Sequence, residues 1–80
     1  MTAAEAGFAP GVIFLHGRFL SPNTRQPAVC RVTSIRHGEV FYGFGVDARK
    51  GAYHARPEYL LEKGARILTA EEAAALPAVY

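Results

Sequence analysis

The amino-acid sequence predicts a mainly β domain, with about five short strands folded into a small barrel or sandwich. Glycine or proline punctuates the 80-residue chain roughly every eight to twelve residues, and the runs between them are rich in Val, Ile, Phe and Tyr. Half of the residues are hydrophobic and 20% are charged, which is typical of a globular domain. A chain of this length is expected to fold as one domain around a small core.

Five segments have the composition of strands. Val, Ile and aromatic residues dominate them, and turn-forming residues lie between them. The first segment contains Gly17, where we expect a bend in the strand. The expected strands are residues 12–20, 28–35, 39–46, 52–56 and 65–68.

A short helical turn is predicted over residues 57–63, between the last two strands. Pro57 suits the first position of a helix because it has no N–H to leave unpaired, and Glu58 favours the positive end of the helix dipole. Gly64 follows and is expected to end the turn.

The C-terminal segment carries the clearest helix signal. Thr69 and Glu72 have the spacing of a capping box, which predicts a short helix over residues 70–76. A helix of about two turns is not stable alone, so we expect it to dock on the rest of the domain. The expected docking residues are Leu76 with Val79 or Tyr80.

The N-terminal residues are expected to form a loose arm. They contain Glu5 and Pro10 and no basic stretch, so they do not have the composition of a secretory signal. We therefore expect three parts in the chain: a flexible arm over residues 1–10, a barrel over 11–68 and a helical tail over 69–80.

The central hairpin, residues 28–46, can pair in two registers. A two-residue loop at His37 and Gly38 pairs Arg36 with Glu39 and mixes apolar and charged residues on both faces. A three-residue loop over 36–38 pairs Ile35 with Glu39 and separates the faces, which sheet pairing favours. Such a loop needs a left-handed residue, which Gly38 supplies. The inner face then holds Ala28, Cys30, Val32, Val40, Tyr42, Phe44 and Val46.

The outer face of this hairpin is the more informative one for function. It holds Val29, Arg31, Thr33, Glu39, Phe41, Gly43 and Gly45. Gly43 is expected opposite Arg31, which leaves an open patch of backbone near Phe41. Such a glycine either lets a strand bend or lets a ligand approach closely.

The order of these parts resembles that of the SH3-like small barrels, the fold shared by SH3, Tudor and KOW-type domains. The resemblance lies in a long first strand, a long loop, the tight hairpin "VTSIRHGEVFYGF", a fourth strand, the helical turn "PEYLL" and the last strand "ARIL". It covers residues 11–68 and is one of architecture and glycine placement. It implies a five-stranded SH3-like barrel.

The sequence shows no catalytic or metal-binding pattern. One cysteine and three histidines lack the spacing of zinc sites, and we expect the cysteine to face inward as inert packing. Glu58 and Glu62 are four residues apart and are expected to form a solvated face. We therefore expect neither an enzyme nor a bound cofactor or metal. The cysteine considered as a zinc ligand is Cys30, and the three histidines are His16, His37 and His54. We expect these histidines to be ordinary turn or strand residues.

The expected compartment is the cytoplasm. The chain has a single cysteine and so cannot form an internal disulfide, which fits a reducing setting. Its longest apolar run, "GVIFL", is far shorter than the ~20 residues needed to cross a bilayer. We expect no membrane partner.

Charge is distributed unevenly along the chain. Residues 16–56 carry seven basic and two acidic side chains, whereas residues 57–80 carry two basic and four acidic ones. A basic middle segment permits a polyanionic partner, and the solubility of a small domain explains it equally well.

Two functions of different class fit these observations. The first is a non-catalytic protein-interaction or adaptor module that contacts a partner, or a second copy in a homodimer, through the outer hairpin face. The alternative is a nucleic-acid-binding module whose basic side chains hold phosphates while Phe41 stacks on a base. The candidate binding residues are Arg31, Arg36, His37, Phe41, Gly43, Arg49, Lys50 and Arg56.

Overall fold

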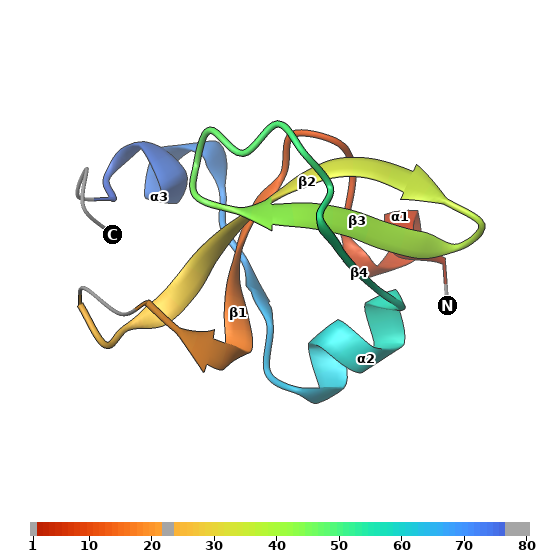
Figure 1. Ribbon diagram of the computed structural model, residues 1–80, viewed down its shortest axis with the longest axis horizontal. Helices are drawn as coiled ribbons and strands as arrows, with labels where there is room; N and C mark the ends of the chain where they lie inside the picture. The colour runs from red at the N-terminus through yellow and green to blue at the C-terminus, as the bar shows by residue number, and fades with distance from the viewer. Residues whose placement is uncertain (1, 22–23, 77–80) are drawn as a thin grey trace.

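A computed structural model describes residues 2–21 and 24–76, which form one antiparallel sheet with short helices around it (Figure 1). The order of the five strands is β4-β3-β2-β1-β5. The strands are β1 (Ile13–Leu20), β2 (Pro27–Arg36), β3 (Glu39–Phe44), β4 (Tyr53–Ala55) and β5 (Arg66–Ile67), and the helices are α1 (Ala3–Ala6), α2 (Pro57–Glu62) and α3 (Ala70–Ala74).

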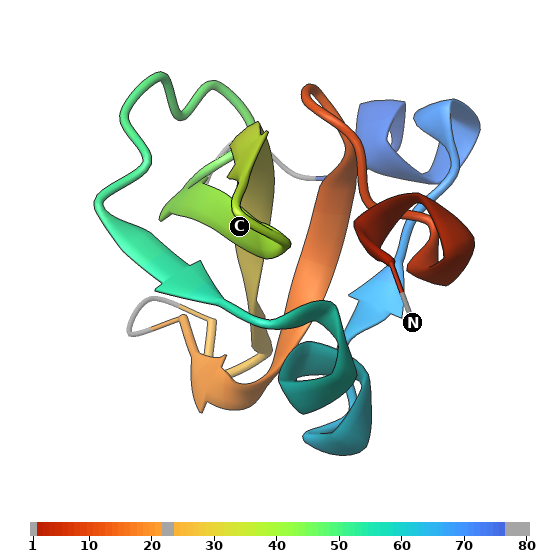
Figure 2. The same ribbon diagram turned by 90° about the vertical axis from the view of Figure 1, so that its right-hand side faces the viewer.

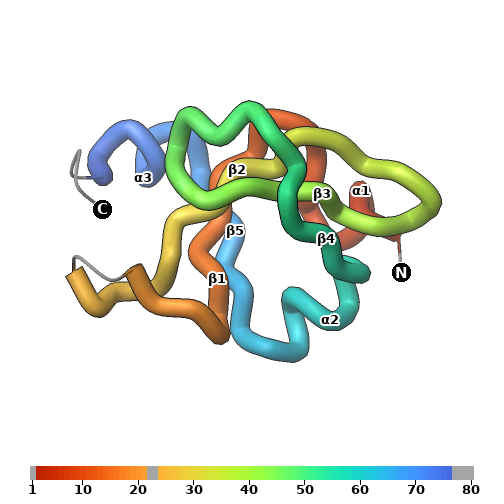
Figure 3. Tube along the Cα trace, in the orientation of Figure 1, coloured from red at the N-terminus to blue at the C-terminus, as the bar shows by residue number. Residues whose placement is uncertain are grey.

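The prediction of a mainly β domain is confirmed, and each strand lies within two residues of its predicted bounds. The sheet is curved but not closed, because β4 and β5 are its two edges. Figure 2 shows α2 between the ends of these edge strands, and the trace in Figure 3 shows β5 running beside β1.

The bend expected in β1 coincides with a close approach between two segments. A Cβ atom added at Gly17 would lie 1.9 Å from the carbonyl oxygen of Lys63, which follows α2. Only glycine leaves room for this contact, so β1 and the end of α2 can pack backbone to backbone.

The tip of the β2–β3 hairpin differs from the predicted three-residue loop. Arg36 pairs with Glu39, so the loop has two residues, His37 and Gly38. Both have positive φ, 50° and 77°, as in the type I′ turn that matches strand twist. Glycine adopts this conformation freely but histidine rarely does, so the residue pair is a weak sequence signal for the turn.

The body of the hairpin nevertheless has the predicted register, because the extra residue lies in β2 and not in the loop. The pairing shifts between Val32 and Ser34, which places a bulge at Thr33. The Thr33 hydroxyl donates to the carbonyl of Phe41 at 3.1 Å. Beyond the bulge Val32 pairs with Tyr42, as predicted.

The inner face of the hairpin is buried over most of its length, and two predicted core residues are not. Phe44 is 40% exposed and Val46 is 49% exposed, because β3 ends at Phe44 and the chain turns away at Gly45, where φ is 103°. Val29, expected on the outer face, is buried, since both faces of β2 are covered where it begins. The core cluster holds Ala3, Phe8, Phe14, Cys30, Val32, Val40, Tyr42 and Leu60.

Ala3 and Phe8 belong to the core, in contrast to the flexible arm expected over residues 1–10. Thr2 and Glu5 form a capping box that begins α1. The chain then buries Phe8, whose ring packs edge-to-face on Phe14 with centroids 5.3 Å apart. The spacing of Thr2 and Glu5 is the sequence signal that predicts this helix.

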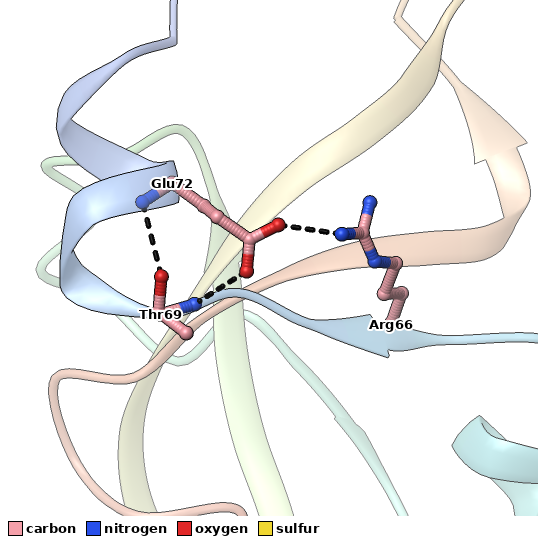
Figure 4. A network of polar contacts seen from close by, with 3 residues as sticks. All are labelled: Arg66, Thr69 and Glu72. Carbon is pink, nitrogen blue, oxygen red and sulfur yellow. Dashed lines mark hydrogen bonds and ion pairs between the residues drawn. The ribbon is translucent and has the colours of Figure 1, made fainter.

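The two other helices begin as predicted. Pro57 occupies the first turn of α2 and is buried with Leu60. At α3 the Thr69 hydroxyl accepts the N–H of Glu72, and the Glu72 carboxylate accepts both the N–H of Thr69 and, at 2.5 Å, a guanidinium N–H of Arg66 (Figure 4). No residue of α3 is buried, and the capping box and the Arg66 contact provide polar contacts at its start. Of the expected docking residues, Leu76 is half-buried, and Val79 and Tyr80 lie outside the described residues.

Candidate binding site

The outer face of the central hairpin is covered by the protein's own chain. Figure 1 shows the segment between β3 and β4, residues 45–52, running back above β3. Gly43 is buried, and a Cβ added to it would lie 2.6 Å from the carbonyl oxygen of Lys50. Arg31 donates a hydrogen bond to the carbonyl of Ala48 at 2.8 Å. The pairing of Arg31 with Gly43 is confirmed, but the expected open patch is wrong, because this loop fills it.

Phe41 is also engaged within the chain. It is half-buried, and its ring stacks on that of His54 with centroids 5.2 Å apart. The Arg36 guanidinium lies 5.9 Å from the Phe41 ring centroid. His54 Nδ1 lies 2.9 Å from a carboxylate oxygen of Glu39, so a side-chain partner holds this histidine.

The other predicted binding residues do not gather at one place. Arg36 and His37 are exposed at the hairpin tip, where β3 begins. Arg49 and Lys50 are exposed in the loop that follows the opposite end of β3, and Arg56 is exposed just before α2. A role of these residues in binding stays a prediction.

A pocket that the sequence pattern does not predict lies where β1 and β3 end and β2 and β4 begin. It encloses about 380 Å³ and has a mostly apolar lining. We call it the aromatic pocket, after its wall residues Phe19, Leu20, Phe44 and Tyr53, which are 47%, 61%, 40% and 48% exposed. Its base is formed by the buried Ala28 and Val29, and Ser21 and Gly45 complete the lining.

The aromatic rings of the pocket support one another. Phe44 packs edge-to-face against Phe19, with centroids 6.2 Å apart, and against Tyr53, at 4.9 Å. Tyr53 stacks on the buried Tyr42 at 5.9 Å. Edge-to-face contacts fix ring orientation, so the pocket walls are held in place before any ligand binds.

A buried histidine supports the pocket from below. Nε2 of His16 lies 3.1 Å from the Tyr42 hydroxyl, and its Nδ1 accepts the backbone N–H of Arg18 at 3.1 Å. The His16 ring lies 4.7 Å from that of Phe19. Burial, and secondly the charge of Arg18, lower the pKa of His16, while burial raises the pKa of Tyr42 to about 12. Both groups are therefore neutral near pH 7.

Cationic side chains lie on two sides of the aromatic pocket. On one side, the Arg18 guanidinium is 5.9 Å from the Phe19 ring centroid and donates to the Tyr59 hydroxyl at 2.9 Å. On the other side is a second hollow of about 600 Å³, which shares Phe44 and Tyr53 with the aromatic pocket. We call it the basic hollow; its lining also includes Gly43, Asp47, Ala48, Arg49, Lys50 and Ala52.

The single thiol of the chain is buried. Cys30 faces inward, as predicted, with no exposed surface, and burial raises the pKa of its thiol to about 12, which leaves it un-ionised. Across residues 2–21 and 24–76, no three His, Cys, Asp or Glu side chains cluster so as to hold a metal ion. In the same ranges, every helix is too short to cross a membrane.

Comparison with known proteins finds no family model that matches this sequence, and no curated protein or solved structure that matches it. The sequence signal for the aromatic pocket is modest. Phe19 and Tyr53 each stand one residue from the end of a predicted strand, whereas Phe44 lies inside the predicted strand 39–46 and becomes a strand end only in the structure.

Proposed function

We propose that this protein is a small, non-catalytic protein-interaction module that binds a partner segment in the aromatic pocket. The observation that carries the proposal is a concave apolar pocket whose three ring walls are each partly exposed. Aromatic residues are enriched at protein interfaces, and apolar side chains that anchor a complex enter such pockets. The volume of about 380 Å³ lies within the range of small ligand sites.

The clustering of exposed apolar side chains supports a binding role. Among the described residues, six large apolar side chains are prominently exposed, and four of them form the walls of this one pocket. Single exposed apolar residues are ordinary, whereas a contiguous patch is typical of an interaction site. The patch rests on the core through Tyr42 and leaves apolar surface in water.

The proposal includes an SH3-like fold and a cytoplasmic location. The fold is supported by the succession of a long first strand, a hairpin, a fourth strand, a helical turn and a last strand beside the first. The location is supported by a single, buried thiol.

The nucleic-acid alternative has less support on the hairpin face. Arg31 holds the loop through Ala48, and Phe41 is stacked on His54. A base or a phosphate would have to displace these contacts. The same coverage argues against a homodimer formed through the outer hairpin face, so a partner, or a second copy, would use the aromatic pocket.

Selection from a random peptide library displayed on phage tests the proposal. Peptides selected on the wild-type protein are expected to share an apolar residue and to lose at least about tenfold in affinity on the Phe44→Ala and Tyr53→Ala variants, the scale of one anchor contact. Val46→Ala is the matched control, because Val46 is 49% exposed and lines neither hollow. Selected peptides that bind all these variants as tightly as the wild type would contradict the proposal.

A further inference from the structure

We infer that the aromatic pocket recognises an acidic segment of a partner protein, in which one apolar anchor residue is flanked by Asp or Glu. The inference rests on the proposed function and adds the chemistry of the ligand. It follows from the contrast between an uncharged pocket and the cations that lie on two sides of it.

The pocket itself selects for an uncharged side chain. None of the residues that line it carries a charge, and its base is the aliphatic pair Ala28 and Val29. A charged group placed there would lose its hydration without gaining an oppositely charged partner. An aliphatic or aromatic anchor instead gains contact with the rings of Phe19, Phe44 and Tyr53.

The surroundings select the charge of the flanking residues. Arg18 is exposed beside Phe19, at one wall. On the other side of the Phe44 and Tyr53 wall, the lining of the basic hollow includes the cations Arg49 and Lys50 and one acidic residue, Asp47. Residues that flank an anchor on either side would thus meet positive charge. Carboxylates suit these positions because exposed complementary charges speed association and exclude wrongly charged partners.

The ring geometry favours a peptide over single-stranded nucleic acid. Bases bind to proteins by stacking on open aromatic faces. Here Phe44 packs edge-to-face against both neighbouring rings, and one face of Tyr53 is already stacked on Tyr42. The base of the pocket is aliphatic, and the hydroxyls of Ser21 and Tyr53 are the hydrogen-bonding side-chain groups of its lining. A compact apolar side chain fills such a pocket better than a flat polar ring.

A set of peptides with one anchor and different flanks tests the inference. Three synthetic peptides share a central Phe and carry Glu, Ser or Lys on both sides, and an oligothymidine of about twelve nucleotides is the fourth probe. Binding is followed by calorimetry and by NMR shifts of pocket residues. We expect the Glu peptide to bind at least tenfold more tightly than the Ser and Lys peptides. This advantage should shrink as salt is raised, because exposed charges are screened.

Charge-reversal variants test which cationic side chains cause the preference for the Glu peptide. Arg18→Glu and the double variant Arg49→Glu with Lys50→Glu are expected to remove most of the preference for the Glu peptide. Arg36→Glu is the control, since Arg36 is exposed at the hairpin tip and its reversal changes net charge as much as Arg18→Glu does. Loss of the preference in all variants alike would attribute it to net charge and overturn the inference.

The remaining outcomes separate the inference from the proposed function. If the Glu and Ser peptides bind equally and both lose affinity on Phe44→Ala, the acidic partner is wrong and the interaction module stands. If no peptide shifts the pocket residues, both are wrong. If oligothymidine shifts them at lower concentration than any peptide, the partner is a nucleic acid and the inference is overturned.

Discussion

The buried imidazole of His16 donates a hydrogen bond from Nε2 to the hydroxyl of Tyr42, across 3.1 Å. The direction follows from the other ring nitrogen, because Nδ1 faces the N–H of Arg18 and can only accept there. A proton on both nitrogens would break the contact with Arg18. The pair lies beneath the aromatic pocket and links the strand that carries Phe19 to the strand that carries Phe44.

The first prediction is that stability falls in mild acid through His16. Its pKa is lowered in the folded state, chiefly by burial, so the unfolded chain takes up the proton more readily. The stabilisation is complete above the ordinary histidine pKa of about 6.5 and is lost as the pH falls below it, until the folded state is protonated too. Urea unfolding at a series of pH values between about 8 and 5 measures this slope.

A variant and a titration test whether His16 causes this dependence of stability on pH. His16→Gln should flatten the slope, whereas His37→Gln should not, because His37 is exposed in the hairpin turn. An NMR titration of the wild-type imidazoles gives an independent value even if His16→Gln folds poorly. A His16 signal that titrates at or above the ordinary histidine pKa would contradict the prediction.

The second prediction concerns the loop that covers the hairpin. Arg31→Met removes the hydrogen bond to the Ala48 carbonyl, and hydrogen bonds of charged groups contribute about 1.5–3 kcal/mol. We expect a loss of this order in the free energy of unfolding and faster amide exchange over residues 47–51. Arg36→Met is the control for losing an arginine on the same strand. Unchanged exchange in the loop of Arg31→Met would show that this contact does not hold it.

The third prediction is that the N-terminal segment is part of the folding unit. Phe8 is 1% exposed and packs on Phe14, so Phe8→Ala should cost about 3–5 kcal/mol, as expected for removing a buried aromatic ring. Leu20→Ala, at 61% exposure, should cost less than about 1 kcal/mol. Chemical unfolding measures both. A Phe8→Ala variant as stable as the wild type would mean that the N-terminal residues do not contribute to the core.

The alternation of apolar and polar residues along the strands predicts which residues pair in the central hairpin. It does not predict the length of the hairpin loop or the position of the bulge. It gives the pair Val32 and Tyr42, because a one-residue slip would turn apolar side chains to the outer face. It does not predict where the one extra residue of β2 is accommodated, since a three-residue loop and a bulge at Thr33 give the same pairing in the body of the hairpin. The choice depends on a left-handed His37, which local propensity does not favour.

The candidate site was harder to predict because burial depends on what covers a face. Alternation places Gly43 outward, correctly, but the loop over residues 45–52 then covers it. It places Phe44 with the core residues, yet the strand ends there and one side of the ring stays open. Both outcomes are set by loops, whose path local sequence does not specify. The aromatic pocket arises from these loop paths.

The last prediction uses Cys30 as a reporter of opening. Its thiol is fully buried with a pKa raised to about 12, so a disulfide reagent such as Ellman's should scarcely react with the native protein at pH 8. Full reaction is expected in guanidinium chloride, where the pKa returns to about 8.5. Phe8→Ala should accelerate native labelling by roughly a hundredfold or more, since each 1.4 kcal/mol of lost stability raises the open population about tenfold. Leu20→Ala should leave the rate nearly unchanged. Fast labelling of the wild type would mean that the sheet opens locally around Cys30 without unfolding of the core that Phe8 helps to form.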